Sequence, residues 1–103
     1  MAKGKDKRGR LSVFKGREAK LNKAIFHILA LKGQQTIYDI HKQIRQQRGL
    51  ARVKYASVNK RVRSLERSGY LRHAGVIGTR AGFETVKYEI EIRSYLALVL
   101  ASV

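Results

Sequence analysis

The amino-acid sequence predicts a small α+β domain, in which three helices precede a two-stranded β-hairpin and a short C-terminal helix. Two observations predict this order. Apolar residues recur with the helical period of about 3.6 residues before Gly69, and mostly with the period of about 2 typical of a strand beyond it. The chain has 103 residues, 44% of them hydrophobic, which is ordinary for one domain that folds around its own core.

Residues 1–16 are predicted to form a basic, flexible tail, because Lys and Arg alternate there with small and polar residues and no apolar period is present. The folded domain is then expected to span residues 17–103. Its first helix is predicted from Arg17 to Lys32, with Gly33 as its end. The apolar stripe of this helix consists of Leu21, Ile25, Ile28 and Leu29.

A second helix is predicted to start at Thr36, because Thr36 followed by Asp39 has the spacing of an N-terminal capping arrangement. It should end before Gly49, and residues 49–54 should form a linker to a third helix at about 55–68. The buried stripes of these two helices are expected to be Ile37, Ile40 and Ile44, and then Val58, Val62 and Leu65. The opposite side of the third helix has basic, hydroxyl and small residues but no acid: Ala56, Ser57, Lys60, Arg63, Ser64 and Arg67.

A hairpin is predicted beyond Gly69, with its first strand at 70–77 and its turn at 78–82. The inward residues of its second strand alternate with polar ones and are expected to be Val86, Tyr88, Ile90 and Ile92. Ser94 is then expected to cap a short helix from Tyr95 to Ala101, which is apolar on more than one face.

The charge points to a polyanionic partner. Lys and Arg number 23 against seven Asp and Glu, a formal net charge of +16 that repels itself in a compact chain. Ten of these cations but only one acid lie between His41 and Arg72, and nine of the ten are on the second and third helices and their linker. Nucleic acid is therefore expected as the partner. A membrane is not, because the apolar run 95–103 is about half the ~20 residues that a span requires.

Enzymatic activity, a metal and a cofactor are not expected. No Ser-His-acid or paired-carboxylate arrangement stands out. Cysteine is absent, and the spacing of the three histidines matches no metal motif. His41 is interpreted as a packing residue, His27 as pointing away from the core and His73 as a candidate phosphate contact on the hairpin. The expected location is cytoplasmic and nucleoid-associated.

Three helices followed by a basic-tipped hairpin form the layout of a winged helix-turn-helix domain. The run from Tyr55 to Leu71, YASVNKRVRSLERSGYL, resembles the recognition helix and strand entry of winged helix transcriptional regulators. Two further stretches, residues 38–40 and 88–90, are similar to those of PadR-like archaeal and bacterial regulators. The resemblance covers roughly residues 21–100, with a longer linker and a shorter terminal helix than many members have.

This resemblance implies a sequence-specific regulator of transcription that binds double-stranded DNA. The helix at about 55–68 would lie in the major groove, and the wing at about 70–92 would contact the backbone or the minor groove. The residues implied nearest base edges are Tyr55, Ser57, Asn59, Lys60 and Arg63, with Asn59 suited to adenine and Arg63 to guanine. Ser64, on the same side of the helix, is also expected to contact DNA. The residues implied to contact the backbone are Arg61, Arg67 and Arg72, with Arg80 at the tip of the wing on the backbone or in the minor groove.

Two other interpretations fit the same charge: a sequence-neutral chromatin-type protein, and an RNA-binding or ribosomal winged helix protein. Asn59 and Tyr55 beside Arg63 favour sequence recognition, because phosphate binding alone needs only Lys and Arg. The basic tail favours the alternatives. A homodimer through the C-terminal and first helices is also expected, although the C-terminal segment could instead pack on the first helix alone.

Overall fold

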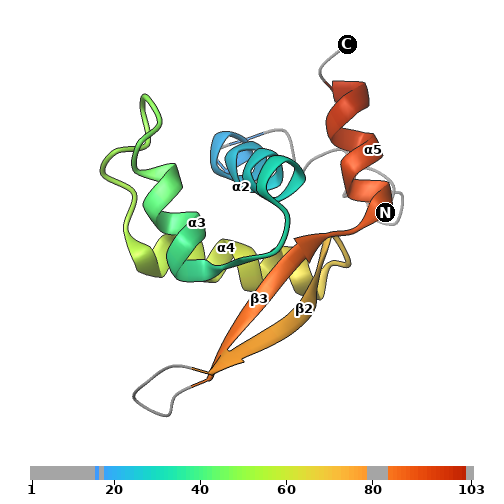
Figure 1. The fold of residues 1–103 in the computed structure, drawn as a ribbon. Helices are drawn as coiled ribbons and strands as arrows, with labels where there is room; N and C mark the ends of the chain where they lie inside the picture. The colour runs from blue at the N-terminus through green and yellow to red at the C-terminus, as the bar shows by residue number, and fades with distance from the viewer. Residues whose placement is uncertain (1–15, 17, 79–83, 102–103) are drawn as a thin grey trace, which may run out of the picture.

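The computed structural model describes residue 16 and residues 18–78 and 84–101. Within them the chain forms a small α+β domain with four helices and one antiparallel sheet (Figure 1). The elements, in chain order, are α2 (Ala19–Lys32), β1 (Gln35–Thr36), α3 (Ile37–Ile44), α4 (Tyr55–Arg67), β2 (Leu71–Gly78), β3 (Glu84–Ile90) and α5 (Ile92–Ala101). The predicted α+β class and the order of its main elements are confirmed.

The sheet has three strands in the described part of the chain, whereas two were predicted. Its order is β1-β3-β2, and β1 joins β3 through pairs of residues such as Gln35 with Tyr88. β1 has only two residues, too few to show the alternation of apolar and polar residues by which a strand is predicted. It forms because it pairs with β3, which lies far from it in the sequence. Between β2 and β3 the register shifts after His73, where the bulge adds one residue to β2.

The starts and ends of the first helices follow from local chemistry. α2 begins at Ala19 and ends before Gly33, whose φ of 79° is a conformation that glycine adopts without strain. The Oγ1 of Thr36 accepts a hydrogen bond of 3.1 Å from the backbone N–H of Asp39, which confirms the predicted cap of α3. α3 ends at Ile44, and turns carry the chain over the predicted linker to α4.

The start of α5 corrects two predictions. β3 ends at Ile90, and Ile92 is the first residue of α5 and 76% exposed, not an inward strand residue. Ser94 lies inside the first turn of α5, where its buried hydroxyl donates a 2.9 Å hydrogen bond to the carbonyl of Tyr70. Ile92 continued the strand alternation in the sequence because the exposed stripe of α5 begins two residues after Ile90, the last inward residue of β3.

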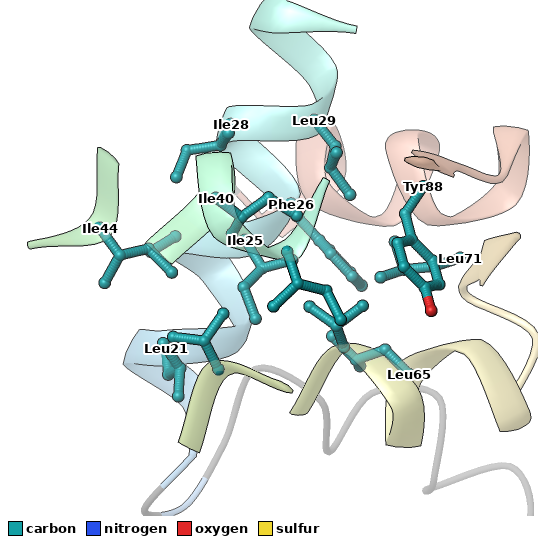
Figure 2. Packing of buried hydrophobic residues seen from close by; sticks show 14 of the residues in the cluster. Leu21, Ile25, Phe26, Ile28, Leu29, Ile40, Ile44, Leu65, Leu71 and Tyr88 are labelled. Carbon is teal, nitrogen blue, oxygen red and sulfur yellow. The ribbon is translucent and has the colours of Figure 1, made fainter. Parts of the chain in front are cut away.

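One core joins the helices to the sheet (Figure 2). Every residue of the three predicted helical stripes is buried, at 8% exposure or less. Phe26 of α2 is fully buried beside the ring of Tyr70, with 6.0 Å between the ring centroids. Each large apolar side chain buried in this way contributes about 1.5–3 kcal/mol. The core thus fixes which side of α4 meets solvent.

The hairpin of β2 and β3 projects away from the helices, and α5 stands at the other end of the view in Figure 1. Most of the predicted turn, including Arg80, lies outside the described residues. In the part of the chain that is described, no helix has the length and apolar character needed to span a bilayer.

Candidate nucleic-acid interface

The solvent side of α4 is basic and free of exposed acids. Val58, Val62 and Leu65 hold the other side against the core. Glu66 is half-buried, at the edge between the two sides. The exposed residues of the helix are Tyr55, Ala56, Ser57, Lys60, Arg63 and Arg67, and Asn59 and Ser64 are half-buried among them. Small side chains alternate there with long cations, so the helix backbone can approach a partner closely between its charged groups.

The carboxylates near this surface are already paired. Glu18 lies 3.9 Å from Arg61, and Glu66 lies 2.7 Å from Nε2 of His73. Glu89 and Glu91 both bind Arg72. Among the described side chains, no carboxylate pairs with the three exposed cations of α4, namely Lys60, Arg63 and Arg67. Their charge is therefore available to an external anion.

Arg61 lies on the side of α4 that faces α2. Its Nε donates a 3.1 Å hydrogen bond to Oδ1 of Asn22, which is buried on α2, and its side chain is 21% exposed. The resemblance implied that Arg61 contacts a phosphate of the DNA backbone. The structure separates it from the exposed cations and gives it a contact that holds α4 on α2.

Arg72, also assigned to phosphate, projects from β2 and is held by two acids. Its hydrogen bond to Glu89 and the charge of that carboxylate raise the pKa of the guanidinium. The same hydrogen bond, followed by one from Gln34, lowers the pKa of Glu89. Both groups stay ionised at neutral pH, and their charges largely cancel. A phosphate would have to compete with two carboxylates for Arg72.

A groove of about 370 Å³ separates α4 from the hairpin. Tyrosine rings from three elements reach it, including Tyr38 of α3 and Tyr88 of β3, which were not among the predicted site residues. Burial raises the pKa of the Tyr88 hydroxyl, which therefore remains protonated at neutral pH. The lining residues are Ile37, Tyr38, Tyr55, Asn59, Arg63, His73, Thr85, Val86 and Tyr88. No sequence signal marks this groove, because it exists only where four separate elements, α3, α4, β2 and β3, meet.

Two histidines contact aromatic rings beside the groove. His41 is half-buried and meets Tyr55 edge-on at 5.6 Å, with its Nε2 2.9 Å from the carbonyl oxygen of Val53, so its predicted packing role is confirmed. His73, the candidate phosphate contact, lies edge-on to Tyr88 at 5.1 Å and also meets Glu66. His27 is exposed, as predicted.

One contact on α4 joins two predicted base-reading residues. The Nε of Arg63 donates a hydrogen bond of 2.7 Å to Oδ1 of Asn59, one helical turn earlier. Both side chains line the groove together with Tyr55. Sequence spacing alone allowed this pair but did not show that it forms.

The structure thus divides the predicted site into three parts. Tyr55, Asn59 and Arg63 meet at the groove, while Ser57, Lys60, Ser64 and Arg67 share the outer side of the same helix. Arg61 and Arg72 are tied to other groups, and Arg80 lies outside the described residues. Within those residues, no cluster of His, Asp or Glu could hold a metal ion.

Comparison of the chain with family models, with curated proteins and with solved structures finds no match.

Proposed function

We propose that this protein binds double-stranded DNA as a winged helix-turn-helix domain and inserts α4 into the major groove. The observation that carries the proposal is the exposed face of α4, where Lys60, Arg63 and Arg67 stand without a carboxylate partner among the described residues. Cations that are fixed on a rigid element and left unpaired are what phosphate neutralisation requires.

The dimensions of α4 support this mode of binding. Its 13 residues extend roughly 20 Å at a rise of 1.5 Å per residue. The major groove of B-form DNA is ~12 Å wide and admits a helix. Ala56, Ser57 and Ser64 are short enough for the helix to lie deep, with the longer cations reaching the strands on either side.

The hairpin of β2 and β3 fits the role of the wing. It borders the same groove as α4, with Thr85 and Val86 on the wall opposite Asn59 and Arg63. In this proposal it follows the backbone or the adjacent minor groove. The sequence between its two strands supplies a further cation, Arg80. Arg72 would join only by exchanging Glu89 and Glu91 for phosphate.

Duplex DNA is favoured over RNA because three exposed cations, Lys60, Arg63 and Arg67, lie on the outer side of one helix. The major groove of A-form RNA is deep and narrow, so side chains on a helix cannot read it. A sequence-neutral chromatin role would use the same cations. Tyr55 and the Asn59–Arg63 pair favour sequence recognition, because phosphate contacts need neither an amide nor a phenol.

A homodimer built through α5 belongs to the proposal. The outer side of this helix is an apolar stripe with helical spacing, and its members are between 44 and 76% exposed: Ile92, Tyr95, Leu96, Val99 and Leu100. With about 200 Å² for a large side chain, these fractions correspond to roughly 600 Å² per chain. Two copies would bury ~1,200 Å², the lower end of stable interfaces. A second copy is the favoured occupant because this stripe carries no charge in a chain of +16.

A dimer would present two α4 helices to half-sites about one helical turn, ~34 Å, apart on a pseudo-palindromic site. The resemblance to PadR-like regulators supports a role in transcription, acting at the nucleoid in the cytoplasm. The sequence offers no candidate for an effector or cofactor in this role.

The direct test is selection of bound sequences from a random duplex library at about 0.15 M salt, where nonspecific dissociation constants are ~10⁻⁴–10⁻⁶ M. We expect an enriched motif with two inverted half-sites. Tight, salt-sensitive binding without a motif would replace sequence recognition by the chromatin-type role. Preference for a structured RNA over every duplex would refute the proposal.

A further inference from the structure

We infer that Arg63 reads a guanine and that Asn59 positions Arg63 for this contact without reading a base itself. The inference rests on the proposed binding of DNA by α4. From the sequence, Arg63 and Asn59 were expected to act independently, with Arg63 reading guanine and Asn59 reading adenine. The inference gives them two different roles.

The hydrogen bond between the two side chains fixes the orientation of the guanidinium. Arg63 follows Asn59 by four residues, so the two side chains are neighbours on the helix surface. Nε of Arg63 lies in the plane of its guanidinium and donates to Oδ1 of Asn59 at 2.7 Å, a short distance for an N–H···O bond. No other partner of the guanidinium is found in the described part of the chain, so its two terminal nitrogens can donate together, the arrangement that pairs with O6 and N7 of guanine.

The acid that follows Arg63 by three residues is held elsewhere. Glu66 is three residues after Arg63 and would be its natural ion-pair partner on the helix. The carboxylate of Glu66 instead lies 2.7 Å from Nε2 of His73, and the ring of His73 is packed edge-on against Tyr88. The hairpin therefore holds Glu66 and leaves the charge of Arg63 unpaired among the described side chains.

Asn59 is poorly placed to read adenine. That contact needs Oδ1 to accept from N6 of the base while Nδ2 donates to N7. Oδ1 of Asn59 already accepts from Arg63, and the Asn59 side chain is half-buried whereas Arg63 is exposed. Arg63 is therefore the residue that would contact the base, and Asn59 would contribute by positioning Arg63.

The test compares the base preferences of Arg63→Ala and Asn59→Ala with those of the unchanged protein, in selections from the same duplex library. We expect the unchanged protein to prefer G at one position of each half-site. Arg63→Ala should lose that preference by about fivefold to 150-fold, the equivalent of ~1–3 kcal/mol. Asn59→Ala should weaken the preference at the same position and leave the other positions unchanged.

Two further variants separate positioning from general effects. Asn59→Asp keeps an oxygen that accepts from Nε, so the G preference should persist even though the added negative charge lowers affinity for every sequence. Arg67→Ala removes an exposed cation of the same helix and should lower affinity uniformly. Thermal unfolding of each variant, followed by circular dichroism, verifies that the selections compare folded proteins.

Different failures have different meanings. If Asn59→Ala relaxes a position other than the one that Arg63→Ala relaxes, Asn59 reads its own base and the inference is wrong. It is equally wrong if Arg63→Ala lowers affinity for all duplexes without changing any base preference. Either result leaves DNA binding intact. Failure of the unchanged protein to bind any duplex would instead overturn the proposed function.

Discussion

α4 and α5 each bury one side and turn the other to solvent, but their outer sides are opposite in chemistry. α4 presents Lys60, Arg63 and Arg67, whereas α5 presents Ile92, Leu96 and Val99. The arginine of α5, Arg93, donates a 3.3 Å hydrogen bond to the carbonyl of Gly69.

This difference shows that the inner sides of the two helices build the core, whereas their outer sides would determine which partner binds. The inner sides of both helices are apolar and pack on one core, through residues such as Val62 and Leu98. The outer sides contribute little to that core. A surface of unpaired cations attracts an anion and repels a second copy, whereas an uncharged apolar surface does the reverse. We therefore expect changes to one outer side to leave the function of the other intact.

The largest expected effect is on self-association. Leu96→Lys should raise the dimer dissociation constant by about 100-fold or more, because a two-fold interface loses the residue twice, at ~1.5–3 kcal/mol per copy. Analytical ultracentrifugation measures this. Val76→Lys, which changes an exposed apolar residue of β2 in the same way, is the control and should leave the dimer intact. The Leu96→Lys protein should still bind DNA that contains a single half-site. Loss of this binding would show that the outer sides of α4 and α5 do not act independently.

The second effect is on DNA binding. Exchanging Lys60 and Arg67 for Glu should weaken binding at 0.15 M salt by about 30-fold or more and reduce the salt slope by about two, as expected for the loss of two phosphate contacts. Fluorescence anisotropy over a range of salt concentrations measures both quantities. The matched control is the double exchange of Lys23 and Lys32 on α2, two exposed lysines that change the net charge equally. Equal losses in both proteins would mean that net charge alone drives binding.

A smaller effect is expected where α5 joins the domain. Ser94→Ala removes the hydroxyl that donates to the Tyr70 carbonyl in a buried position, and should lower the free energy of unfolding by about 1 kcal/mol. Urea unfolding measures it. Ser68→Ala, at an exposed serine, should change the same quantity by less than ~0.5 kcal/mol. No difference between the two variants would show that the Ser94 hydroxyl does not hold α5.

The smallest expected effect is on the dependence of thermal stability on pH. The pKa of Glu89 is lowered by its hydrogen bonds to Arg72 and then Gln34, so its carboxylate binds protons more weakly in the folded chain than in the unfolded one. The stabilisation is therefore present above pH 4.5, its ordinary pKa, and is lost as pH falls through the lowered value. In Glu89→Gln, Tm should depend less on pH below 4.5. Because the pair is exposed, 0.5 M salt should shrink the difference; identical curves for both proteins would contradict this account.

The inward face of each of the first three helices could be predicted from the sequence. Ile25, Ile40 and Val62 are all fully buried, because the period of an apolar stripe records which side of a helix meets the core. The Thr36 cap was predictable for a similar reason, since donor and acceptor lie three residues apart. Such features need only local information.

The features that were missed depend on residues far apart in the chain. β1 forms because Gln35 meets Tyr88, and Arg61 turns towards Asn22 of α2, 39 residues earlier. Neither contact leaves a periodic trace. The same holds for the pairing of Arg72 with Glu89, so the resemblance of the sequence to a family could not show that these two arginines are bound within the chain.

The peptide groups on either side of Tyr70 link the two surfaces. The N–H of Tyr70 donates to the carbonyl of Leu65 in α4, and the carbonyl of Tyr70 accepts from both Glu91 and Ser94 at the start of α5. The backbone groups of Tyr70 therefore connect α4, the helix proposed to enter DNA, with α5, the helix proposed to pair two copies. In a dimer built through α5, we expect these hydrogen bonds to hold the two α4 helices at a set distance from each other. Binding would then depend on the spacing of the two half-sites as well as on their sequence. Inserting even a few base pairs between the half-sites should prevent the second α4 from reaching its half-site.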